Sequence, residues 1–257
     1  MSVARVLGLP ALALGAALVV LGPAQAQKPE IAAACQVPPE LISDQAEFPN
    51  AMRAVARSKH LTVVAIGAAS TEGTGASSPQ AAWPERLQQV LAQHLPGTTV
   101  KVVNLGRRGN TAHMMLDRFA TEVVPARPDI VVWETGTVEA VRATDPEELH
   151  AALSEGMDQV AAMHADLVLM DPQYARSSDL VINFQPYLQV IGMTADLPEV
   201  NLFPRHEIMR YWVEEGRIRP TTRDEMIRGN DALYDCIAQL LAEVIDRGLG
   251  NAAHAAR

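Results

Sequence analysis

The stretch LTVVAIGAASTEG, residues 61–73, decides the fold, because it reads as a strand that leads into a sharp turn and then a helix. The apolar run at 61–67 is short and rich in β-branched residues, as a buried parallel strand is. Small residues follow it directly. A strand that ends in such a turn can present a nucleophile to a substrate, so this turn holds the first candidates for function.

Apolar runs and amphipathic stretches alternate along the rest of the chain. We predict further strands at 100–106, 129–136 and 166–173. Apolar residues spaced by three and four predict helices at 83–94, 114–124 and 146–164, and a last helix at 231–247 closed by Gly248 and Gly250. The alternation predicts right-handed βαβ units, and therefore an α/β fold with a central parallel sheet between two helical layers. Residues 61–250 form one domain after a lead-in at 27–60.

Composition and charge narrow the class of partner. The chain has 257 residues and a formal net charge of −9, with 48% hydrophobic residues, enough for one substantial core. Nucleic acids and anionic membrane surfaces favour clustered Lys and Arg. The acidic balance therefore argues against both as main partners.

The N-terminus reads as a signal peptide at residues 1–26. Arg5 precedes an apolar run at 6–21, and Ala24-Gln25-Ala26 supplies the small-x-small pattern that signal peptidase cleaves. Glycines and Pro10 weaken the alternative, a transmembrane anchor. We expect cleavage after Ala26, a periplasmic or secreted protein, and no membrane span in the mature chain.

Export gives the two cysteines a meaning. Cys35 and Cys236 are the cysteines of the chain, and an even number in an oxidising compartment predicts a disulfide. Two unrelated buried thiols are the alternative.

Ligands of parallel sheets bind at the carboxyl ends of the strands, so the segments after each strand carry the functional signal. These segments and their flanks hold, in chain order, Cys35, Gly67, Ser70-Thr71, Gly73, Trp83-Pro84, Asn104, Gly106, Gly109, Pro128-Asp129, Trp133, Gly136-Thr137, Asp171, Phe203, Arg205, Asp231, Tyr234 and Cys236. In this order the residues resemble the SGNH or GDSL hydrolases, most closely an exported bacterial branch. The resemblance implies a doubly wound, flavodoxin-like three-layer sandwich and ester hydrolysis by a serine.

The resemblance also shows where the chain departs from the family. Counting back from Thr71 and Gly73 places the nucleophile at Ala69, whose methyl group cannot attack a carbonyl. Gly109 keeps the position of a backbone oxyanion donor. Val138 stands where the family has the asparagine amide, and loss of one such donor typically costs about a hundred- to a thousandfold in rate.

The last block is altered as well. Counting back from Asp231 and Cys236 places the catalytic Asp at Glu225 and the His at Arg228. Arginine stays protonated, so it cannot act as the general base. We therefore interpret the chain as a noncatalytic member, a binding or scaffold module of the cell envelope.

An active enzyme with a rearranged site is the alternative. Ser70 would then be a displaced nucleophile and His206 its base, with Ser77 or Ser78 as weaker nucleophiles. The competing interpretation of Ser70 is a hydroxyl bonded to its own turn, and that of His206 is a histidine at a surface or a helix start. Such an enzyme would be an esterase or deacetylase acting on acylated carbohydrate or lipid.

A basic rim is the remaining candidate. The Gly109 amide with Arg107, Arg108 and Arg228 could hold a carboxylate or a sugar acid, since guanidinium groups suit planar anions. Alternatively, Arg228 pairs with Glu225 and the other two are solvated loop charges. The expected partners are a small carbohydrate or acyl ligand or an envelope protein. Phosphate-loop, dinucleotide and metal motifs are absent from the sequence, so we expect no cofactor and no metal.

Overall fold

The protein is built on one parallel sheet of five strands in the order β2-β1-β3-β4-β5. The computed structural model describes residue 1 and residues 30–42, 46–217 and 223–255, with the backbone alone at 223–228 and 251–255. The strands are β1 (His60–Ile66), β2 (Thr99–Asn104), β3 (Ile130–Glu134), β4 (Asp166–Met170) and β5 (Val200–Phe203). The four predicted strands and the doubly wound α/β fold are confirmed.

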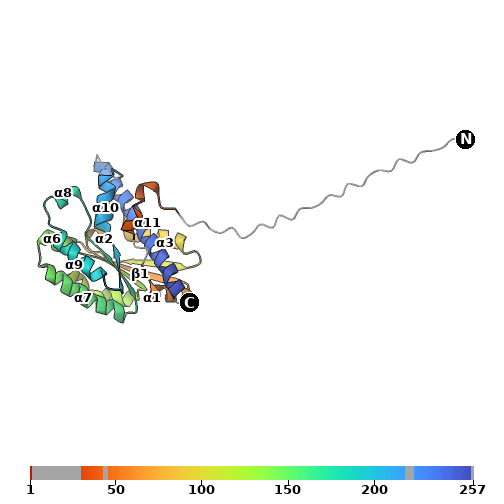
Figure 1. Ribbon diagram of the computed structural model, residues 1–257, viewed down its shortest axis with the longest axis horizontal. Helices are drawn as coiled ribbons and strands as arrows, with labels where there is room; N and C mark the ends of the chain where they lie inside the picture. Colours follow the sequence, from red (N-terminus) through yellow and green to blue (C-terminus); the bar gives the residue numbers. More distant parts are fainter. Residues whose placement is uncertain (2–29, 43–45, 218–222, 256–257) are drawn as a thin grey trace.

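Helices cover both faces of the sheet (Figure 1). Successive side chains of a strand point to opposite faces, so Leu61 and Val63 pack with one helical layer while Val64 and Ile66 pack with the other. The first layer holds α1 (Pro49–Ser58), α3 (Trp83–His94) and α11 (Arg223–Ala255), and the second holds α4 (Ala112–Leu116), α7 (Pro146–Ala162) and α9 (Gln185–Ala195). The remaining α-helices are α2 (Ala69–Glu72), α5 (Val124–Ala126), α6 (Thr137–Arg142), α8 (Arg176–Asp179) and α10 (Arg205–Glu214).

The path of the chain places a functional edge between β1 and β3. From β1 the chain moves outward to β2, then returns past β1 to β3 and continues to β4 and β5. The connections on the two sides of this switch point therefore diverge at the carboxyl ends of β1 and β3, where ligands of such sheets commonly bind.

Two predicted helices differ from the structure. The helix expected at 114–124 breaks after Leu116 and continues as a π-helical turn, Phe119–Val123. Arg118 lies at the break, and its guanidinium donates to the Leu105 carbonyl and to Glu122, which fixes this irregular path.

The last helix also differs, since it runs through both glycines that were expected to close it. Gly248 is internal because the ring of Phe48 packs directly against its Cα, where a Cβ would clash.

The predicted disulfide between Cys35 and Cys236 is confirmed. It ties the lead-in segment to the middle of α11, and both cysteines are buried. The predicted signal peptide lies outside the described residues, apart from Met1. Among the described helices, none is both long and apolar enough to cross a membrane.

The disulfide predicts a large loss of stability on reduction. It closes a loop over 201 residues, so the chain-entropy model gives an upper value of about 5 kcal/mol for the free energy that it contributes. We expect the Cys35→Ser/Cys236→Ser variant to unfold at a lower urea concentration than the wild type, with a free energy of unfolding smaller by about 2–5 kcal/mol. A variant with the wild-type midpoint under non-reducing conditions would contradict a stabilising bridge.

Candidate functional site

The candidate site is the carboxyl edge of the sheet, where the segments after all five strands meet. The turn after β1 is compact because Gly67 and Gly106 allow close approach. A Cβ on Gly67 would lie 2.7 Å from the Glu134 carboxylate, and one on Gly106 would clash with the backbone at Thr71 and Glu72. Ala69 begins α2 and is half-buried at this edge. The position that the sequence resemblance assigns to the nucleophile therefore carries a methyl group.

Ser70 is held inside a buried polar network. Its Oγ donates to Oε2 of Glu134 at 2.8 Å and accepts from Nη1 of Arg205 at 2.9 Å. Glu134 is the last residue of β3, and Arg205 begins α10 directly after β5. The hydroxyl thus bonds side chains from two other strand ends, and not its own turn as one sequence interpretation expected.

Glu134 and Arg205 form the centre of this network. Arg205 Nη2 lies 2.9 Å from Glu134 Oε1, and both side chains are almost fully buried. Thr71 Oγ1 donates to Glu134 Oε2 at 2.6 Å, while Arg205 Nε donates to the Asp171 carbonyl at 3.1 Å. Four strand ends are therefore joined through one ion pair.

The electrostatics of Glu134 decide what the network can do. Burial raises the pKa of its carboxyl. The Arg205 guanidinium and the hydroxyls of Thr71 and Ser70 together lower that pKa by more than burial raises it, so the pKa lies below its usual value. A carboxylate held ionised in this way is a weak base. A general base works best with a pKa near the working pH, so Glu134 is poorly suited to activate Ser70.

His206 lies in a pocket of its own beside the network. Its ring contacts Tyr174 edge-on and Phe184 at a tilt, and its Nε2 lies 3.3 Å from Oδ1 of Asp179. Burial lowers the pKa of His206 more than Asp179 raises it. Among the contacts of the described residues, no hydrogen bond joins His206 to Ser70. The pairing of the two as base and nucleophile therefore stays a prediction.

The segments after β2 and β3, which carry Gly109 and Val138, are tied to one another. Glu139 of α6 accepts from the Ala112 amide and, at 3.1 Å, from the Gly136 amide, which links the loop after β2 to the loop after β3. Gly109 is half-buried with φ +78°, and its carbonyl accepts from Arg142 at 2.9 Å. Val138 is half-buried against the second helical layer and offers no donor.

The predicted basic rim stays a prediction. Arg107 lies 2.8 Å from Glu122, which also pairs with Arg118, and Arg108 is exposed. The side chains of Glu225 and Arg228 lie outside the described residues, so their predicted roles and their mutual pairing are untested. Arg107 is thus an exposed loop residue that is also ion-paired.

Serines further along the loop have structural contacts. Ser77 donates its amide to Asp231 Oδ1 at 2.9 Å and its hydroxyl to Oδ2 of the same carboxylate. Ser78 is exposed just before a short 3₁₀ turn, Pro79–Ala81. Ser77 therefore fastens this loop to α11.

Sequence reasoning missed Glu134 and Asp179, and it matched Arg205 and Asp171 to the family without their contacts at this edge. One signal was available for the first, because Glu134 is a carboxylate at the end of an otherwise apolar strand. Within the described part of the chain, the group of His, Asp and Glu side chains close enough to share a metal ion lies elsewhere, on α3 and α11.

Comparisons with known proteins place this edge in context. A model described as the Non-GDSL lipase-like family matches residues 34–251. An arylesterase of Vibrio mimicus is 27% identical over 147 residues, covering 54% of this chain and 70% of that protein. The structure is similar to that of TesA, with a TM-score of 0.57 and 20% identity over 71% of this chain and 99% of that one.

Two carbohydrate esterases share the fold. A two-domain esterase active on acetylated mannans has a TM-score of 0.65 at 15% identity, covering 81% of this chain and 57% of that one. A variant of Axe2, an acetyl xylan esterase from Geobacillus stearothermophilus, has a TM-score of 0.57 at 19% identity, covering 74% of this chain and 94% of that one.

The buried ion pair predicts the effect of Glu134→Gln. Removing one partner leaves the Arg205 charge buried without its counter-ion, which typically costs about 3–5 kcal/mol. We expect a loss of that size in urea unfolding. Glu147→Gln is the matched control, because Glu147 is an exposed partner of His150 and its loss should change stability by less than about 1 kcal/mol. Equal effects of the two variants would contradict the role given to Glu134.

Asp171 predicts a pH dependence of stability. Burial raises the pKa of its carboxyl from 3.8 to about 7, although the hydrogen bond that the His206 amide donates to Oδ1 lowers that pKa. Between these values the folded state holds a proton that the unfolded state has lost, so this group makes stability fall as pH rises, by at most about 1.4 kcal/mol per pH unit. We expect Asp171→Asn to gain stability relative to the wild type from about pH 4 to pH 7, with a plateau above. If the free energies of unfolding of the wild type and Asp171→Asn changed in parallel with pH, the raised pKa of Asp171 would be contradicted.

Proposed function

Because the chain belongs to the Non-GDSL lipase-like family of SGNH-type proteins, we propose that it keeps the fold of an ester hydrolase but binds its ligand without turning it over. The observation that carries the proposal is the pairing of Ala69 with a fully bonded Ser70. The family's nucleophile position holds a methyl group, and the adjacent hydroxyl is occupied on both sides by Glu134 and Arg205.

Each step of acyl transfer lacks a group that could perform it. Nucleophilic attack needs an oxygen whose proton passes to a base. Ser70 directs its proton to a carboxylate with a lowered pKa, while its lone pair faces a guanidinium. Stabilising the oxyanion needs converging donors, and Val138 supplies none. The Gly109 amide is one remaining donor and would give little rate alone.

The ligand that we propose is an acylated or acidic carbohydrate, bound at this edge in the periplasm or outside the cell. Support for the ligand class comes from the acetyl xylan and acetylated-mannan esterases that share the fold. Support for export comes from the Cys35–Cys236 disulfide, since such bonds persist in oxidising compartments. We propose that Arg108 and the Gly109 amide bind an anionic group of this ligand. An envelope protein is the alternative partner.

A second candidate is an active ester hydrolase with a rearranged site. The name of the Vibrio mimicus relative, an arylesterase, favours it. Ser70 would have to leave the network and meet His206, whose imidazole now faces Asp179. An active enzyme would release a carboxylic acid from an aryl, acyl or acetyl-sugar ester.

Short-chain aryl esters and acetylated xylan decide between the two functions. We expect the purified, folded chain to hydrolyse neither above the buffer rate, because Glu134, the carboxylate that accepts from Ser70, has a lowered pKa and is a weak base. Turnover that scales with protein concentration and disappears in Ser70→Ala would overturn the proposal and establish the second candidate. Ser77→Ala is the matched control, since Ser77 bonds Asp231 outside the network.

Binding is measured on the same protein. Calorimetry with acetylated xylan fragments and uronic acids should give saturable binding to the wild type that Arg108→Gln weakens. Arg53→Gln serves as a control far from the edge, because Arg53 is exposed on α1. No heat with either class of carbohydrate would remove the proposed ligand and leave an envelope protein as the partner.

A further inference from the structure

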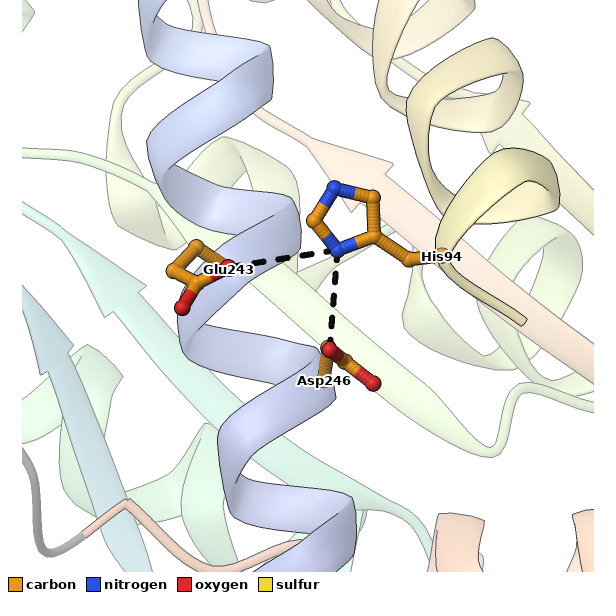
Figure 2. A group of neighbouring side chains, drawn as sticks. All are labelled: His94, Glu243 and Asp246. Carbon is orange, nitrogen blue, oxygen red and sulfur yellow. Dashed lines mark ion pairs between the residues drawn. The ribbon is translucent and has the colours of Figure 1, made fainter. Parts of the chain in front are cut away.

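A cluster of three metal-ligating side chains lies at the opposite edge of the sheet from the candidate site. His94 is the last residue of α3, which runs back from the carboxyl edge toward the start of β2. Glu243 and Asp246 are three residues apart on α11, so they share one face of that helix. Figure 2 shows the imidazole pointing at both carboxylates across the contact between the two helices.

The distances suit an ion held between the three groups. His94 Nδ1 lies 3.6 Å from Oδ2 of Asp246 and 4.0 Å from Oε2 of Glu243, and the three ligand atoms all lie within 4.8 Å of one another. Zinc binds nitrogen and carboxylate oxygen at about 2.0–2.2 Å in a tetrahedral arrangement, which places neighbouring ligand atoms roughly 3.4 Å apart. Small rotations of the two carboxylates would close the remaining gap.

Burial supplies an independent sign that a ligand belongs here. The His94 side chain is 2% exposed, yet its Nδ1 has no hydrogen-bond partner among the described residues. Buried polar atoms are nearly always satisfied, so an unsatisfied nitrogen aimed between two carboxylates calls for a bound group. The geometry points to a divalent cation rather than a direct hydrogen bond, because both oxygens lie beyond hydrogen-bond distance.

The surroundings orient one ligand and open the cluster to solvent. Arg247 Nε donates to Oε1 of Glu243 at 2.6 Å, which fixes that carboxylate with its other oxygen toward His94. His94 also lines a surface cavity of about 280 Å³ beside Gln93 and Gln239, so the cluster adjoins solvent. An imidazole in the ligand set favours zinc and similar transition metals over calcium and magnesium, which prefer oxygen alone.

We propose that His94, Glu243 and Asp246 bind one Zn²⁺ ion, which bridges the end of α3 to α11. The three protein ligands leave a fourth position to solvent. The bridge joins the same helical layer as the disulfide, since Cys236 lies on α11 as well. The role that follows is the stabilisation of this layer, independent of the function proposed for the carboxyl edge.

Metal binding by the untagged, disulfide-bonded chain tests the proposal. After chelation and dialysis, titration with ZnCl₂ should show one tightly bound ion per chain by calorimetry and by elemental analysis. Both cysteines of the chain are in the disulfide, so no thiol can account for the binding. At about a hundredfold excess over Kd, Zn²⁺ should raise the melting temperature by roughly 5–10 °C.

Three variants locate the ion. His94→Gln and Glu243→Gln should each raise Kd at least about tenfold, since even outer-sphere partners contribute tenfold or more. His150→Gln is the matched control, because His150 is exposed on α7 beside a carboxylate of its own, and its Kd should equal that of the wild type. Glu243 is half-buried, so its variant stays informative should His94→Gln fail to fold. No binding by the wild type, or equal Kd in wild type and Glu243→Gln, overturns the proposal.

Discussion

The ion pair between Glu134 and Arg205 is the interaction on which the carboxyl edge depends. It joins the end of β3 to the segment after β5, and through Ser70 and the Asp171 carbonyl it reaches the ends of β1 and β4. Two buried charges are tolerable when each is paired and hydrogen-bonded, so the partners fix one another in place. The contacts that give the edge its shape thereby also occupy the hydroxyl of Ser70, which follows Ala69 in the chain.

The fold was largely predictable because its signal is local and periodic. Alternating buried strands and amphipathic helices gave four strands, the parallel sheet and the span of α3. Strand β5 was missed because Val200–Phe203 is four residues long and half-buried at its centre. The length of α11 was underestimated because Gly248 reads as a helix stop, whereas its lack of a side chain serves the packing of Phe48.

The site was predictable only where position along the chain decides it. Spacing from neighbouring motif residues assigned roles to Ala69, Gly109 and Val138 that stay predictions, whereas the family match confirms the SGNH resemblance on which that spacing rests. The network was not predictable, because Ser70 and Arg205 lie 135 residues apart and meet only in the folded sheet. A pattern read along the chain gives the residue at a position, and does not give the partner that changes its chemistry.

The disulfide also sets an order of events during synthesis. Cys236 follows all five strands, while Cys35 precedes them. The covalent ring can therefore close only after the ribosome has made the whole sheet and the first half of α11. A chain that stops before Cys236 keeps Cys35 as an open thiol, available to a thiol reagent or a quality-control oxidoreductase. The state of that one sulfur thus reports whether synthesis has passed Cys236.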